Sequence, residues 1–157
     1  MKNVELTTIG FSEWRRQIAP LWGMESSSQL IQHTANGHGQ MQYVGREQFR
    51  RVILFPIAAE LEGRRIAWTS TYNISDEAVR VRGIYVLPEF RDRGIGHLMT
   101  NHALALWPAP WKRCFMYAWP ANVARYERWG FAIAPGHEMR TEADGTEMVL
   151  MQKELRT

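Results

Sequence analysis

One segment of the chain reads Val86-Leu87-Pro88-Glu89-Phe90-Arg91-Asp92-Arg93-Gly94-Ile95-Gly96-His97, and it joins two different patterns. Residues 78–87 alternate between apolar and polar side chains and predict a strand, whereas the apolar spacing over 94–107 predicts a helix. Gly94 and Gly96 have no Cβ, so an oxygen atom can approach the backbone closely. The first turn of a helix also presents unpaired N–H groups and a partial positive charge. The segment therefore predicts an anion site suited to phosphate, to which Arg91 and Arg93 add charge.

Two common nucleotide-binding loops do not fit this segment. A P-loop is excluded because no Lys-Ser/Thr pair follows the glycines. A dinucleotide-binding turn would need a third glycine, and an acid downstream of a first strand. The phosphate site therefore belongs to another kind of fold.

The remaining patterns predict a mixed α/β domain without repeats. A helix is expected over 11–22, where Ser12 would cap the first turn and Pro20 would bend or end the helix. A second helix is expected over 26–33, before a loop at 36–39. Strands over 51–61 and 66–74 flank the short turn Glu62-Gly63-Arg64 and form an antiparallel hairpin. A strand over 112–119 precedes a helix over 120–129, and strands over 131–134 and 147–153 complete the chain.

Length and composition indicate a single globular domain. The chain has 157 residues, of which 45% are hydrophobic and 22% charged. It can therefore bury a stable core without disulfides or a structural metal. No apolar run approaches the ~20 residues that a membrane-spanning helix needs. Charged Lys2 and Glu5 stand where a signal peptide would have its apolar core. A cytoplasmic location and no membrane partner are the resulting predictions.

Cysteine, histidine and charge content narrow the chemistry further. The single cysteine, Cys114, has no partner for a disulfide, and the five histidines lack ligand spacing, so no metal is predicted. Cys114 lies in an apolar strand, where a buried thiol is inert. The formal charge of +3 favours a small anionic ligand and does not call for nucleic acid.

The glycine segment resembles the signature of the GNAT superfamily of N-acetyltransferases. That signature, Arg/Gln-x-x-Gly-x-Gly/Ala after a strand, corresponds to Arg91-Asp92-Arg93-Gly94-Ile95-Gly96. A second element, Tyr126-Glu127-Arg128-Trp129-Gly130-Phe131, is similar to the family's Tyr-x-x-x-Gly-Phe and follows in the same order. The resemblance covers residues 50–155. It implies a mixed, mostly antiparallel, twisted sheet of about six to seven strands with helices on both faces. It also divides the single domain 1–157 into a helical acceptor or lid region at 1–45 and a cofactor-binding core at 50–155.

The resemblance also implies roles for individual residues. Acetyl-CoA would be the cosubstrate, its pyrophosphate lying on the loop formed by Arg91, Asp92, Arg93, Gly94, Ile95, Gly96 and His97. Pantetheine would pair like an added strand with Ile84, Tyr85 and Val86. Tyr126 would be the general acid that protonates the departing thiolate. Many relatives place an asparagine seven positions before this tyrosine. Here that position is Trp119, and the candidate contact is Asn122.

The acceptor and the general base are left open by the residues. The resemblance implies direct attack of a primary amine in a ternary complex, and Trp14 and Trp22 favour a small aromatic or amphipathic molecule. A peptide, a protein or an aminoglycoside is an alternative acceptor, as is a non-catalytic module that binds CoA or nucleic acid. Candidate bases are Glu25, Glu60, Glu77 or a chain of ordered water. The sequence also leaves a homodimer open.

Overall fold

A computed structural model describes residues 3–21, 41–43, 49–51, 54–107, 111–136, 140–141 and 147–155. The expected helix at 26–33, the loop at 36–39, Trp22 and Glu25 lie outside these residues. Within the described part of the chain, no helix is long and apolar enough to cross a membrane.

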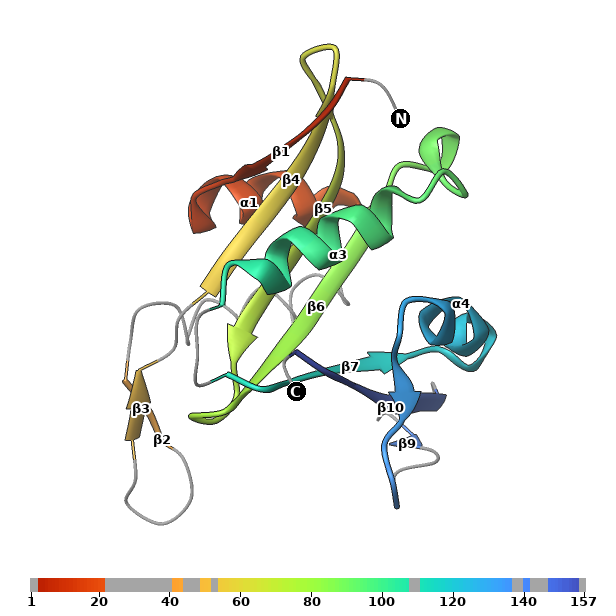
Figure 1. Cartoon of the computed structure of the whole chain (residues 1–157). Coiled ribbons are helices and arrows are strands. Elements are labelled where there is room, and N and C mark those ends of the chain that lie inside the picture. The colour runs from red at the N-terminus through yellow and green to blue at the C-terminus, as the bar shows by residue number, and fades with distance from the viewer. Residues whose placement is uncertain are drawn as a thin grey trace.

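The central feature is a twisted sheet whose strands follow the order β1-β4-β5-β6-β7-β10-β8, with β9 paired to β10 (Figure 1). Its strands are β1 (Val4–Thr8), β4 (Leu54–Leu61), β5 (Arg64–Asn73), β6 (Ala78–Val86), β7 (Arg113–Ala118), β8 (Ala132–Ile133), β9 (Arg140–Thr141) and β10 (Glu147–Glu154). Two further short strands, β2 (Met41–Tyr43) and β3 (Phe49–Arg51), pair with each other. Among the described pairs β6 and β7 run parallel and the others antiparallel, which confirms the mixed, mostly antiparallel sheet.

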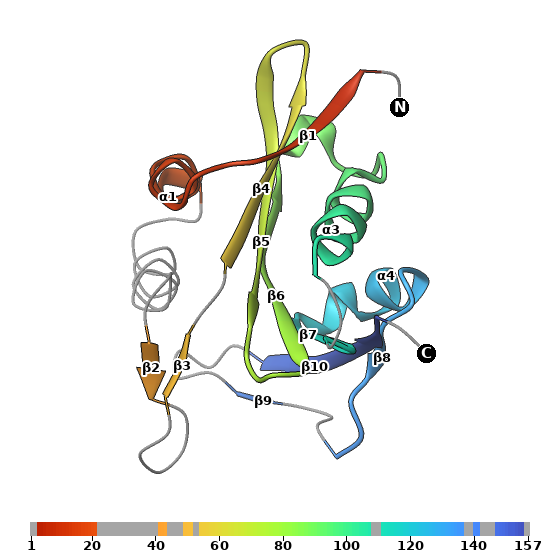
Figure 2. The same cartoon turned by 60° about the vertical axis from the view of Figure 1, so that its left-hand side comes forward.

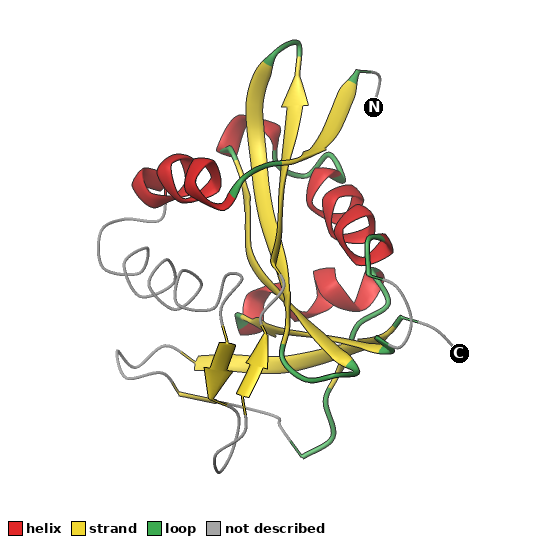
Figure 3. Ribbon diagram, turned by 90° about the vertical axis from the view of Figure 1, so that its left-hand side faces the viewer, coloured by secondary structure: helices red, strands yellow, loops and turns green. Residues whose placement is uncertain are grey.

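Helices cover both faces of this sheet, as predicted (Figures 2 and 3). Helix α1 (Phe11–Ile18), followed by the 3₁₀ turn η1 (Ala19–Leu21), lies on one face. The other face carries α3 (Ile95–Ala105) and α4 (Val123–Arg128), preceded by the 3₁₀ turns η2 (Pro88–Phe90) and η3 (Pro120–Asn122). The sheet therefore separates an α1 side from an α3/α4 side.

The N-terminal part differs from its prediction in two ways. Residues 4–8 form β1, which pairs with β4 from Val4↔Leu61 to Thr8↔Ile57, so the region 1–45 is not purely helical. Its five residues are too few for alternation to stand out, and the pairing comes from tertiary contact. The first helical hydrogen bond runs from Trp14 N to Gly10 O at 2.9 Å. Gly10 therefore precedes the first turn, and Ser12 lies inside the helix instead of capping it.

Strand β5 forms the buried centre, because its residues from Ala67 to Asn73 are all shielded from water. On the α1 side, Trp14 and Ile18 pack on Trp68. On the α3/α4 side, Ile95 and Met99 of α3 pack on Ala67. This apolar packing fixes where the two ends of α3 lie relative to the sheet.

Strands β6 and β7 separate soon after they begin. They pair at Ala78↔Arg113, Val79↔Cys114 and Arg80↔Phe115, after which β6 continues to Val86 without a further partner on this edge. The register between β5 and β6 also shifts at the level of Gly83, whose φ is +76°. A positive φ within a strand marks a bulge that bends it. The result is a wedge between two diverging parallel strands, open toward the N-terminus of α3.

Candidate active site

The turn before α3 leaves its backbone amides without a described carbonyl partner. Asp92 and Gly94 adopt positive φ values of 61° and 79°, and the first bond of the helix runs from Leu98 N to Gly94 O. In the described structure, the amides of residues 92–97 donate to no backbone carbonyl outside the helix. A Cβ built on Gly94 would meet nothing within 4 Å, so the outer side of the turn is open. The turn thus leaves room for an anion at its amides, and the phosphate site stays a prediction.

Gly96 also has a packing role that its spacing does not predict. A Cβ at this position would lie 3.1 Å from the indole of Trp129 and 3.5 Å from Cγ2 of Ile84. The absent side chain thus admits Trp129, which packs between α3 and α4. His97 stacks on the same indole with ring centroids 5.1 Å apart and planes 5° from parallel. Burial, aided by Lys153, lowers the pKa of His97, so its imidazole is neutral at neutral pH.

The charged side chains of the turn are engaged with the protein. Arg91 Nε donates to Val86 O at 2.9 Å, and its guanidinium lies 5.3 Å from the Tyr85 ring centroid. Arg93 lies 5.4 Å over the Phe90 ring. Asp92 pairs with Arg125 of α4 at 3.4 Å, which links the turn to the second helix. The amides of this turn are therefore more available to a ligand than its guanidinium groups.

Tyr126 of α4 lies against the same indole, at 4.9 Å between centroids in an edge-to-face arrangement. Its ring packs on the core cluster that includes Val81 and Ala118, one from each diverging strand. The Tyr126 hydroxyl has no hydrogen-bond partner among the described residues. Burial raises the pKa of Tyr126 against a smaller opposing effect of Arg125. The phenol consequently keeps its proton and can give it to a stronger base.

The helix α4 is fixed at both ends. Asn122 precedes it, its amide donating to Trp119 O at 2.8 Å, and its side chain makes no capping hydrogen bond. At the other end, Lys153 Nζ donates to the carbonyl of Trp129 at 2.8 Å. Trp119 itself, at the end of β7, is 60% exposed. Sequence reasoning overlooked Trp129 and Lys153, although Trp129 stands within the Tyr126–Phe131 motif.

Two nucleophile and base candidates can now be placed. Cys114 is buried, and desolvation raises the pKa of its thiol to about 12, so almost no thiolate forms at neutral pH. Glu77 is exposed next to the paired end of β6 and β7, with its carboxylate 4.0 Å from Lys112. That end is opposite to the open wedge, and Glu77 therefore does not fit the role of base.

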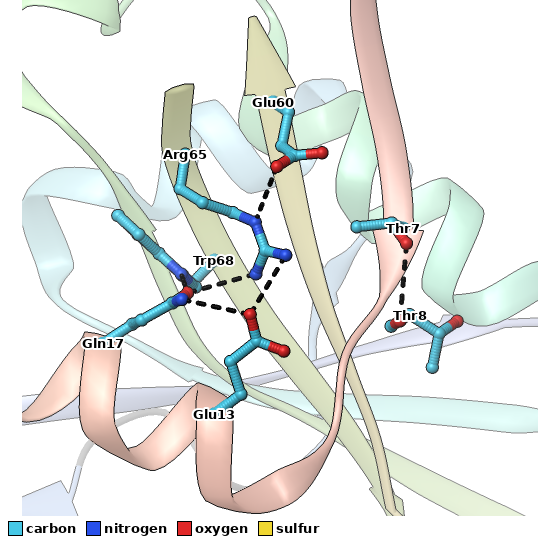
Figure 4. Close-up of polar contacts among 7 residues, drawn as sticks. All are labelled: Thr7, Thr8, Glu13, Gln17, Glu60, Arg65 and Trp68. Carbon is cyan, nitrogen blue, oxygen red and sulfur yellow. Dashed lines mark hydrogen bonds and ion pairs between the residues drawn. The ribbon is translucent and has the colours of Figure 1, made fainter. Parts of the chain in front are cut away.

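Glu60 belongs to a polar network on the α1 side, shown in Figure 4. Arg65 is at its centre, with Nε 3.0 Å from Glu60, Nη2 3.2 Å from Glu13 and Nη1 3.2 Å from the Gln17 side-chain oxygen. The indole N–H of Trp68 donates to that same oxygen at 2.8 Å. The network ties α1 to β4 and β5. The Glu60 carboxylate is held in this network by its ion pair with Arg65, so it is not a free acceptor for a proton from the substrate.

Comparison with known families settles the class of protein. The family described as "Acetyltransferase (GNAT) domain" matches residues 53–133. The chain belongs to the GNAT acetyltransferase family. This GNAT protein is accordingly an N-acetyltransferase with acetyl-CoA as its cosubstrate. The matched residues include the diverging strands, the turn before α3 and Tyr126.

Solved GNAT structures share the fold over nearly the whole chain. An Elizabethkingia anophelis GNAT acetyltransferase with acetyl-CoA bound is 16% identical, with a TM-score of 0.65 over 98% of this chain and 99% of that one. The ribosomal-protein-S18-alanine N-acetyltransferase of Escherichia coli is 14% identical, with a TM-score of 0.68 over 98% and 95%. An aminoglycoside 6'-N-acetyltransferase with coenzyme A is 10% identical, with a TM-score of 0.65 over 98% of both chains. No match was found among curated protein sequences. In the described part of the GNAT chain, no cluster of acidic, histidine or cysteine side chains could hold a metal ion.

Proposed function

We propose that this acetyltransferase transfers the acetyl group from acetyl-CoA to a primary amine of a small molecule, by direct attack in a ternary complex. The observation that carries the proposal is the wedge between β6 and β7, which opens onto the free amides of the α3 turn. A linear thioester with a charged phosphate end matches a slot with strand-like backbone groups along one wall and an anion site at its mouth.

In this proposal acetyl-CoA lies along the wedge, from its pyrophosphate at the α3 turn to its thioester near Tyr126. The amides of residues 92–97 would hold the pyrophosphate, with Gly94 keeping the turn open. The free edge of β6 at Ile84, Tyr85 and Val86 would bond the pantetheine amides, except that Val86 O already accepts from Arg91. Asn122, beside the exposed Trp119, would contact the pantetheine arm from the α4 side.

Tyr126 supplies the proton for the leaving group in this proposal. The neutral amine nitrogen attacks the thioester carbonyl carbon, the C–N bond forms, and collapse of the tetrahedral intermediate breaks the C–S bond. Tyr126 gives its phenolic proton to the departing sulfur, and the nitrogen releases one proton to water. The products are the N-acetylated amine and CoA with a free thiol, after which water returns a proton to Tyr126. Backbone N–H groups of β6 polarise the carbonyl as negative charge develops on its oxygen.

The acceptor would enter from the α1 side of the sheet, opposite the helices that hold the cofactor. This assignment divides the single domain into a core over 50–155 and an acceptor region within 1–45. A peptide acceptor and an aminoglycoside acceptor are the alternatives, since one structural neighbour is a ribosomal-protein acetyltransferase and another an aminoglycoside acetyltransferase. The net positive charge of +3 disfavours a polycationic aminoglycoside.

The deciding experiment is an acetyl-CoA turnover screen that reads the released thiol. The panel contains small primary amines, peptides with free N-termini and aminoglycosides, each with and without enzyme. We expect turnover with small amines and little with the other two classes. Turnover confined to peptides or to aminoglycosides would replace the small-molecule assignment. Acetyl-CoA binding without turnover of any amine would favour a non-catalytic CoA-binding module.

A further inference from the structure

The α1 face of the sheet carries an arginine at the point where β6 and β7 part. Arg80 is the last residue of β6 that pairs with β7, opposite Phe115, and it also pairs with Tyr72 of β5. Its guanidinium lies 4.9 Å over the ring of Tyr117 on β7, and its Nη1 donates to the Tyr72 hydroxyl at 3.2 Å. One tyrosine from each strand that flanks β6 thus holds the guanidinium at the apex of the wedge.

Side-chain alternation places this group on the acceptor side. Cys114, Met116 and Ala118 of β7 belong to the cluster that packs under α3 and α4, so Tyr117 points to the opposite face. Tyr72 lies four residues after Trp68 on β5 and therefore shares its face, which packs against α1. Arg80 therefore faces the same side as α1, next to the site where the acetyl group would lie.

No acid in the described part of the chain compensates this charge. Within the described residues, no carboxylate lies within 4.0 Å of the Arg80 guanidinium, although the residue is more than half buried. Nε is buried and has no hydrogen-bond partner, and Nη2 has no described acceptor. The contrast with Arg65 is direct, because that guanidinium contacts two carboxylates.

A partly buried guanidinium whose N–H groups lack acceptors costs free energy of folding, unless a ligand supplies those acceptors. Its planar fork matches a carboxylate, which can accept two parallel hydrogen bonds. We propose that Arg80 binds a carboxylate of the acceptor, so that the enzyme prefers primary amines that also carry a carboxyl group. This inference rests on the proposed function and narrows its substrate class to amino-acid-like molecules. It also gives Arg80 a role as a substrate-binding residue that determines specificity.

The test compares acceptors that differ in the carboxylate. Initial rates are measured with phenylalanine against phenethylamine, and with tryptophan against tryptamine, for the wild type, Arg80→Met and Arg80→Lys. We expect kcat/KM to favour the amino acids, and Arg80→Met to reduce that preference by ~10- to 100-fold, mainly through KM. Arg80→Lys should restore part of it, because charge returns without the fork. Dividing each variant's preference by that of the wild type cancels the different basicity of the amines.

Arg113→Met is the matched control. Arg113 lies on β7, where that strand pairs with β6, but it is exposed and forms an ion pair with Glu154 at 3.4 Å. Its loss should therefore leave the preference unchanged. Equal preference in wild type and Arg80→Met, with turnover intact, would overturn the carboxylate site while the proposed function stands. A preference for the decarboxylated amines in the wild type would do the same.

A binding measurement keeps the inference testable if no acceptor is turned over. Calorimetric titration of the full chain with N-acetylphenylalanine and with N-acetylphenethylamine compares a product-like carboxylate with its neutral counterpart. We expect tighter binding of the carboxylate, lost in Arg80→Met, with the melting temperature shift induced by acetyl-CoA retained. Equal binding of the two probes, or binding of neither, would overturn the site. Absent turnover together with this selective binding would count against the proposed function alone.

Discussion

The two faces of the sheet offer different kinds of polar group to a ligand. On the α3/α4 side the proposed cofactor groups are backbone amides at a turn opened by Gly94, together with one hydroxyl. On the α1 side the polar groups are long side chains bonded to one another, as around Arg65 (Figure 4), or held by tyrosine rings, as at Arg80. Backbone sites depend on glycine position and helix onset, which leave a fixed spacing in the sequence. Side-chain sites can be built from many residue types at many positions.

The largest expected effect tests the α3/α4 side. Tyr126→Phe keeps the ring against Trp129 and removes the hydroxyl, so kcat should fall by ~10²–10⁴-fold, the range for a positioned general acid. Steady-state kinetics with the acceptor found in the turnover screen measures the change. The acetyl-CoA-induced melting shift should be unchanged.

Glu127→Gln alters the exposed neighbour on the same helix and should retain turnover. Near-normal turnover of Tyr126→Phe, accompanied by a lower melting temperature, would make Tyr126 a packing residue only.

A second test distinguishes the effect of the α3 turn on acetyl-CoA binding from the general effect of backbone strain on stability. Gly94→Ala forces a side chain into φ +79°, which costs ~1–2 kcal/mol, and the turn is expected to relax at the expense of its amide geometry. Acetyl-CoA should bind about 10-fold more weakly, the equivalent of 1.4 kcal/mol. Calorimetric titration measures the affinity.

Gly63→Ala is the matched variant, because Gly63 has φ +80° and equally open space in the β4–β5 turn. It should lose similar stability and keep full affinity. If both variants bind acetyl-CoA as the wild type does, the turn is not the phosphate site. Gly96 is unsuited to this test, because a side chain there would displace Trp129.

The third test addresses the α1 side through two adjacent arginines. Arg65→Met leaves Glu13 and Glu60 without their shared cation, and the free energy of unfolding should fall by about 1–2 kcal/mol. Arg64→Met removes an ion pair with Glu89 in which the two side chains are 61% and 51% exposed, so its effect on stability should be much smaller. Urea unfolding of both variants gives the comparison. Equal losses would mean that the network does not anchor α1.

The smallest effect is expected at Cys114. Because the thiol pKa is raised to about 12, no reactive thiolate is available between pH 6 and 9. Cys114→Ala should keep wild-type turnover, and two-substrate kinetics should give intersecting lines. A thiol reagent should leave the folded wild type active over that pH range. Parallel lines together with a trapped acetyl-enzyme would show a covalent route through Cys114 instead.

Features that depend on local backbone patterns could be predicted from the sequence, whereas features that depend on contacts between distant side chains could not. The turn before α3, the β4–β5 hairpin and the Tyr126 helix were predicted from local patterns of glycine, proline and apolar spacing. Strand β1 was missed because its pairing with β4 is a long-range contact. The packing role of Gly96 was also missed, since nothing in the spacing shows that Trp129 would fill the place of its side chain. Arg80 was visible only as a charge on a strand, because its partners come from β5 and β7.

The short parallel ladder between β6 and β7 also bears on how the protein opens. Three residue pairs join the sheet of β1, β4, β5 and β6 to that of β7, β8 and β10, with the core cluster around Val79 and Met151 as the further connection. Few hydrogen bonds crossing a seam allow the two parts to exchange amide protons as separate cooperative units. A ligand bound along both walls would join them, so acetyl-CoA should slow exchange on β6 and β7 together and merge two opening events into one.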